Sequence, residues 1–153
     1  MLTLYRPNLS DLWFRQALLA DEETMSYNRA WGGTILFPEE DWSDWYDYWI
    51  ARPEGKRFYR YLSDGGLFVG EVAYHYDAEL GGMIADVIVY APARGKGYGR
   101  AGLRLLCAAA KENGITELYD DIASDNPAVG LFLRHGFAEA FRADGKIVLK
   151  KTL

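Results

Sequence analysis

The sequence predicts a mixed α/β (α+β) domain, and two kinds of observation predict it. Short segments rich in β-branched and aromatic residues are joined by glycine-containing turns at Asp64, Gly65 and Gly66 and again at Ala143, Asp144 and Gly145, a pattern typical of β-hairpins. A helix-forming segment that ends at Asn113 and Gly114 joins two neighbouring strands, which should therefore be parallel. Antiparallel hairpins and one parallel pair together indicate a mixed sheet.

Each element has a local signal. The strands are expected from alternating or apolar runs at residues 2–7, 56–63, 67–77, 83–90, 116–122, 137–142 and 146–152. A first helix should begin at Ser10 or Asp11 and run to about Leu19, and a short second one should end at Gly32 and Gly33. Further helices are expected over residues 37–50, after the glycine-rich loop near residue 97, and from Asn126 to His135. The pattern contains no linker, so residues 1–153 should form a single domain.

Composition narrows the class of protein. Half of the 153 residues are apolar and a quarter are charged, which favours a folded soluble chain. The formal net charge of −5 argues against nucleic-acid binding. Cys107 is the single cysteine, so neither an internal disulfide nor a cysteine-based metal cluster is expected. No metal is expected either. We expect a cytoplasmic protein with no membrane partner, because no apolar run approaches a membrane span and no signal peptide is evident.

Residues 87–106, "VIVYAPARGKGYGRAGLRLL", form a strand, a glycine-rich loop and a helix start, which is how a phosphate-binding loop is built. The nucleoside-triphosphate pattern requires Ser or Thr after the lysine, but Gly97 follows Lys96. Residues 97–102 fit the dinucleotide pattern G-x-G-x-x-G, with Asp120 about twenty residues on. That pattern should directly follow its strand and open a series of βαβ units, and neither condition is met here. The dinucleotide interpretation is therefore disfavoured.

Residues 94–99, "RGKGYG", fit [Q/R]-x-x-G-x-[G/A], which resembles the acyl-CoA signature of the GNAT superfamily of N-acetyltransferases. The stretch "NPAVGLFLRHGF" resembles that family's second motif, N-x-x-A-x-x-L-Y-x-x-x-G-F. The order of expected elements is similar to the family's along nearly the whole chain. The resemblance implies a GNAT-like fold, with a mixed sheet of six to seven strands, helices on both faces and a splayed parallel strand pair.

The resemblance also implies where acetyl-CoA, as co-substrate, would bind. The strand before the loop should offer backbone groups to the pantetheine arm, and the loop should hold the pyrophosphate on its N–H groups. Asn126 should contact the arm near its thiol end. The implied acetyl-CoA-binding residues are Val87, Ile88, Val89, Arg94, Gly95, Lys96, Gly97, Tyr98, Gly99, Arg100, Asn126 and Phe132.

Two positions depart from the family's second motif. Asp125 takes the strict place of the motif's asparagine, and Asn126 comes one position later. Phe132 takes the place of a tyrosine that commonly protonates the leaving thiolate. Tyr119, Tyr90 or a water molecule could serve instead. Unassisted departure is also open, because a thiol has a pKa of about 8.5.

Transfer to an amine requires a neutral amine, so a carboxylate should remove a proton. Asp86 interrupts the apolar run "MIADVIVY" just before the loop and ranks first as this base. Asp120 on the next strand ranks second and Glu71 ranks third. The resemblance implies that the segment between Arg29 and Arg52, which includes Trp31, walls the acceptor pocket, where its acids and aromatic residues would suit a cationic amine. The favoured interpretation of these aromatic residues is nevertheless that they pack the helix onto the sheet.

These patterns predict an acetyl-CoA-dependent N-acetyltransferase that acts on a primary amine, most simply a small cationic molecule. A protein N-terminal or lysine acetyltransferase, and a CoA-binding module without transferase activity, are the alternatives. The sequence leaves the formation of a homodimer open.

Overall fold

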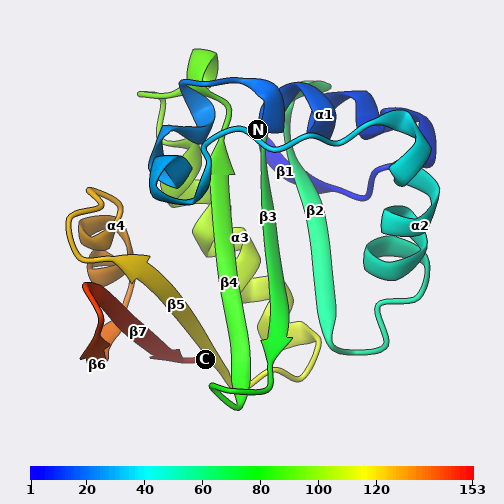
Figure 1. Cartoon of the computed structure of the whole chain (residues 1–153). Coiled ribbons are helices and arrows are strands. Elements are labelled where there is room, and N and C mark those ends of the chain that lie inside the picture. The colour runs from blue at the N-terminus through cyan, green and yellow to red at the C-terminus, as the bar shows by residue number, and fades with distance from the viewer.

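A seven-stranded mixed sheet organises the chain, with strand order β1-β2-β3-β4-β5-β7-β6 (Figure 1). The computed structural model describes the backbone of residues 1–153 and every side chain except that of Ala30. The strands are β1 (Leu2–Tyr5), β2 (Arg57–Asp64), β3 (Leu67–Asp77), β4 (Gly82–Val89), β5 (Glu117–Ala123), β6 (Ala138–Ala143) and β7 (Lys146–Thr152). The expected mixed sheet is confirmed, and all seven expected strands are present.

The sheet consists of two antiparallel parts joined by one parallel contact. Strands β1 to β4 are antiparallel neighbours, and so are β5, β7 and β6. Between them, β4 and β5 run parallel but pair only at Met83 with Leu118 and at Ile84 with Tyr119. Beyond these two pairs the strands diverge, as Figure 1 shows. The expected parallel pair is confirmed, and its divergence opens the sheet in the middle.

Helices cover both faces of the sheet. On one face, α3 (Tyr98–Glu112) buries an apolar stripe of Leu103, Leu106, Cys107 and Ala110. On the other face lie η1 (Leu9–Asp11), α1 (Leu12–Ala20) and the segments up to residue 51. Strand alternation sends Val72 and Tyr74 into the first core and Ala73 into the second, so β3 is buried on both sides.

The expected helices before β2 are more broken than their sequence pattern suggests. Residues expected to form the second helix form a 3₁₀ segment, η2 (Thr24–Trp31). The expected helix at residues 37–50 is divided into η3 (Glu39–Asp41), α2 (Trp42–Tyr46) and the π-helical η4 (Asp47–Ala51). A short 3₁₀ turn, η5 (Ala91–Ala93), precedes the glycine-rich loop, and α4 (Val129–Arg134) begins later than expected. In the described part of the chain, no helix is long and apolar enough to cross a membrane.

Candidate active site

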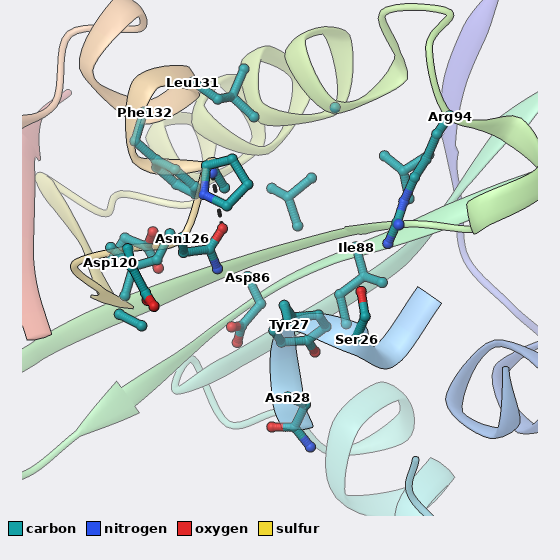
Figure 2. A pocket seen from close by; sticks show the side chains of 18 of the residues that line it. Ser26, Tyr27, Asn28, Asp86, Ile88, Arg94, Asp120, Asn126, Leu131 and Phe132 are labelled. Atoms are coloured by element: carbon teal, nitrogen blue, oxygen red, sulfur yellow. Dashed lines mark hydrogen bonds between the residues drawn. The ribbon is translucent and has the colours of Figure 1, made fainter. Parts of the chain in front are cut away.

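A cavity of about 980 Å³ lies where β4 and β5 diverge (Figure 2). Its walls come from η2, from the second half of β4, from the glycine-rich loop, from the end of β5 and from the segment leading into α4. Twenty-five residues line it: Ser26, Tyr27, Asn28, Arg29, Trp31, Asp86, Val87, Ile88, Val89, Arg94, Gly95, Gly97, Tyr98, Gly99, Asp120, Asp121, Ile122, Ala123, Asp125, Asn126, Pro127, Ala128, Leu131, Phe132 and Lys146. The cavity thus brings together most of the residues singled out in the sequence.

The glycine-rich loop presents unpaired backbone donors to this cavity. Gly95 and Gly97 both have φ of +82°, a left-handed conformation that glycine adopts without strain. Among the described residues, the N–H groups of residues 95–100 donate to no backbone carbonyl, whereas the N–H of Ala101 donates to Gly97 and continues into the helix. Several free N–H groups at the positive end of a 15-residue helix form a site for an anion such as a phosphate.

Hydrogen bonds to η2 hold the loop in place. The guanidinium of Arg94 donates to the backbone oxygens of Glu23, at 3.3 Å, and of Thr24, at 3.0 Å. The N–H of Ala91 donates to the hydroxyl of Thr24 at 2.9 Å. Arg94 therefore lines the cavity and also connects the loop to η2 through hydrogen bonds. Lys96 and Arg100 lie on the exposed surface of the loop and helix, outside the lining.

The second half of β4 supplies one wall. Val87, Ile88 and Val89 all line the cavity, and the edge of β4 facing β5 has no ladder partner beyond Ile84. On its other edge, β4 approaches β3 closely, and a Cβ added at Gly70 would lie 2.3 Å from the Ile88 oxygen. Gly70 thus permits this close approach of β3 to β4, while the other edge of β4 keeps backbone groups free on the cavity side.

Asp86 projects from this wall into the cavity, next to Tyr27 (Figure 2). Its side chain is 55% exposed and lines the cavity, whose walls displace water around the carboxylate and thereby raise its pKa to about 6. The nearby Glu71 and Asp121 carboxylates raise this pKa further, and Arg15 opposes them. His75 lies beside Asp86, with Nδ1 4.0 Å from Oδ2. The geometry gives Asp86 a proton affinity suited to a base near neutral pH.

Asp120 faces the cavity from β5 and is almost completely buried. The residue is 6% exposed, and its Oδ2 is buried without a hydrogen-bond partner among the described residues. Burial, with added repulsion from Asp86 and Asp121, raises the pKa of Asp120 to about 8. The neighbouring Asp121 is instead exposed and lies 3.6 Å from the Lys146 ammonium.

Glu71, the third candidate base, lies outside the cavity lining. Arg15 donates to both of its carboxylate oxygens, at 3.1 and 2.8 Å, and the Tyr59 hydroxyl donates to it as well. The Arg15 guanidinium in turn stacks 4.5 Å from the centre of the Trp45 ring. Glu71 is therefore the anionic partner of a buried cation, and its oxygens are already engaged.

The segment before α4 forms the opposite wall. The Asn126 side-chain oxygen accepts from the Ala128 N–H at 2.9 Å, which leaves the amide nitrogen free on the cavity side (Figure 2). Asp125 also lines the cavity. Phe132 is 4% exposed and packs edge-on against Phe137, with ring centres 5.1 Å apart. Tyr119 and Tyr90, considered as substitutes for the missing hydroxyl, are not among the lining residues.

Sequence reasoning missed the contribution of η2. Ser26, Tyr27 and Asn28 line the cavity, yet their segment has no apolar periodicity or motif that would indicate a binding wall. Of the aromatic residues between Arg29 and Arg52, Trp31 lines the cavity. Trp42, Trp45 and Trp49 pack instead against the core around Tyr59. For these three, packing against the sheet is the correct interpretation.

Solved structures of N-acetyltransferases share the fold of this chain. The chain adopts the fold of ribosomal-protein-alanine N-acetyltransferase from Brucella melitensis, with a TM-score of 0.76, 22% identity and 99% of each chain covered. Spermidine N-acetyltransferase from Vibrio cholerae, in complex with CoA and spermine, is similar with a TM-score of 0.75 and 20% identity over 97% of this chain and 92% of that one. PaiA N-acetyltransferase from Thermoplasma acidophilum, in complex with coenzyme A, has a TM-score of 0.73 and 13% identity over 100% and 99% of the chains.

No curated protein matches the chain by sequence. The model of the acetyltransferase (GNAT) family, however, matches residues 17–137, which include β4, the glycine-rich loop and α4. The resemblance found in the two motifs is thereby confirmed over most of the chain. The chain belongs to the acetyltransferase (GNAT) family.

Proposed function

We propose that the chain transfers the acetyl group of acetyl-CoA to the primary amine of a small cationic molecule, with Asp86 as the base. The observation that carries the acceptor class is the charge of the cavity. Asp86, Asp121 and Asp125 line it. The cationic lining residues are Arg29, Arg94 and Lys146, of which Arg94 is tied to backbone oxygens and Lys146 lies beside Asp121. None of these three cations forms an ion pair with Asp86 among the described residues, so an amine that carries a positive charge is attracted to the Asp86 carboxylate.

The glycine-rich loop and β4 fit the donor. Free N–H groups of residues 95–100 would hold the pyrophosphate, and the free edge of β4 at Val87 to Val89 would pair with the amides of the pantetheine arm. The amide nitrogen of Asn126 would contact the arm near its end. When bound, acetyl-CoA supplies an activated acetyl group. Neighbours of the same fold are described in complex with coenzyme A, which supports this assignment.

Asp86 would act on the acceptor. A protonated amine cannot attack, and a carboxylate with pKa of about 6 is largely ionised at neutral pH yet basic enough to take the proton. The same negative charge would hold the ammonium form before transfer. The Vibrio cholerae neighbour is described with spermine, a cationic amine, which supports this acceptor class.

The experiment is an acetyl-transfer assay with matched acceptors, in which products are identified by mass spectrometry. Purified protein and acetyl-CoA are incubated with an alkyl diamine, with the monoamine of the same chain length and with a peptide that has a free N-terminus. The diamine should give a kcat/KM at least about tenfold above the monoamine, because its second ammonium gains about 1.4 kcal/mol in the acidic cavity. Preferential acetylation of the peptide would replace the small amine with a protein acceptor.

A further inference from the structure

We propose that Asp120 is the proton donor to the departing thiol, and that Asp86 and Asp120 work as a pair that carries one proton between them. The inference rests on the proposed function, because it concerns the second half of the same transfer. It assigns to Asp120 the role of acid rather than that of base.

The place of Asp120 in the fold is the first argument. The last ladder pair between β4 and β5 joins Ile84 to Tyr119, so Asp120 is the first residue of β5 beyond the point of divergence. Asp86 lies two positions beyond the same point on β4. The two carboxyls thus enter the cavity from opposite strands. Figure 2 shows Asp120 on the side of Asn126 and Phe132, while Asp86 lies next to Tyr27.

The partners of Asp120 are the second argument. A buried carboxylate requires a cation or several donors, and Asp120 Oδ2 has none among the described residues. The charged groups nearest to it are the carboxylates of Asp86 and Asp121, and the cation on that side, Lys146, lies beside Asp121. The negative charge of Asp86 disfavours a second charge at Asp120, so the two carboxyls together keep one proton at neutral pH. Burial favours Asp120 as its holder, with pKa about 8 against about 6 for Asp86.

Other hydroxyl groups of the cavity are less suited to this role. The Tyr98 hydroxyl donates to Asp64 at 2.6 Å and is engaged outside the cavity. Tyr27 lies on the η2 wall, next to Asp86, and burial together with the charge of Asp86 raises its pKa to about 12. Phe132 has no hydroxyl. Asp120, in contrast, holds a proton at neutral pH and lies on the cavity wall opposite to Asp86, the proposed base.

The acceptor enters as an ammonium, and Asp86 first takes one proton from it and releases that proton to solvent, so that the attacking amine is neutral and Asp86 is again ionised. As the carbon–nitrogen bond forms, Asp86 takes a proton from the amine nitrogen. As the carbon–sulfur bond breaks, its electron pair stays on sulfur, and Asp120 gives its proton to that sulfur. The pair starts as ionised Asp86 with protonated Asp120 and ends with the proton on Asp86. Proton transfer from Asp86 to Asp120, directly or through water, restores the starting state.

The first test needs no substrate. Aspartate carboxyls labelled with carbon-13 are titrated by NMR in the free protein, and Asp120→Asn identifies the resonance of Asp120. We expect that resonance to titrate near pH 8. Titration at the ordinary aspartate pKa would overturn the proposal, since Asp120 would then hold no proton at neutral pH.

The second test is the single-turnover rate of acetyl transfer as a function of pH. The wild-type rate should fall above about pH 8 as Asp120 loses its proton, and Asp120→Asn should be about 100-fold slower at pH 7 without that alkaline decline. Glu117→Gln is the control, because Glu117 lies on the same strand, pairs with Lys150 and does not line the cavity. It should match the wild type.

An Asp120→Asn rate equal to wild type, with the alkaline decline retained, would overturn the role of Asp120 while leaving acetyl transfer intact. If the wild-type protein acetylates no amine, both the proposed function and the role of Asp120 are overturned. The two failures are therefore distinguishable. If Asp120→Asn does not fold, the alkaline decline of the wild-type rate still decides, because its absence would overturn the role of Asp120.

Discussion

Glu71 and Asp120 are both buried carboxyls at 6% exposure, but their surroundings are opposite. Glu71 receives two donations from Arg15 and one from the Tyr59 hydroxyl, and it lies outside the cavity. Asp120 has a buried oxygen without a partner, carboxylates as its charged neighbours, and a place in the cavity wall. A partnered buried acid stabilises the fold, whereas an unpartnered acid in a cavity wall is the one that our proposal makes a proton donor. Burial alone does not distinguish the two.

The largest expected effect is on stability at the partnered site. Glu71→Ala leaves the Arg15 guanidinium partly buried without its carboxylate, and we expect a loss of about 3 kcal/mol in the free energy of unfolding. Chemical denaturation measures it. Glu117→Ala, which breaks the more exposed pair with Lys150, should cost at most about 1 kcal/mol. Equal losses in the two variants would mean that Glu71 contributes no more than a surface acid.

At Asp120, which lacks a partner, we expect the stability of the fold to depend on pH. The folded-state pKa of Asp120, about 8, lies above the unfolded value near 3.8, so the folded state binds the extra proton between these limits. Its contribution to stability is complete below about pH 4 and is lost as the pH rises toward 8. Asp120→Asn should remove this decline from denaturation curves recorded across that range. A variant whose stability still declines in parallel with wild type would contradict the assignment.

Backbone N–H groups at the two ends of α3 also differ in whether they have a hydrogen-bond partner. Gly97 and Gly114 both have φ of +82° with open space at Cβ, so valine is strained at either site by about 1–3 kcal/mol. Gly97 lies among the free N–H groups, whereas the Gly114 N–H donates to Lys111. Gly97→Val should weaken CoA binding at least about tenfold by calorimetry, and Gly114→Val should leave it unchanged. A Gly97→Val protein that folds and retains its CoA affinity would exclude the loop as the pyrophosphate site.

The sequence predicted the sheet and the loop because their signals are local. Alternating apolar residues and glycine turns define the hairpins, and the spacing of Arg94, Gly97 and Gly99 defines the loop. The difference between Glu71 and Asp120 is not local, since it depends on Arg15, which lies 56 positions away in the chain from Glu71. The η2 wall was missed for a similar reason: it forms a 3₁₀ segment held by Arg94 and Thr24, contacts that no periodicity reveals.

The most direct test of the account compares the amine kinetics of Asp86→Asn and Glu71→Gln with those of the wild type, corrected for the folded fraction. Asp86→Asn should lower kcat/KM for the amine at least about tenfold, or ~1.4 kcal/mol of transition-state stabilisation, with CoA affinity unchanged. It should also remove the decline in rate below about pH 6, where wild-type Asp86 becomes protonated. Glu71→Gln should stay within about twofold of wild type at neutral pH. An Asp86→Asn enzyme that matches wild type, beside a Glu71→Gln enzyme that fails, would place the base at the partnered acid and contradict the account.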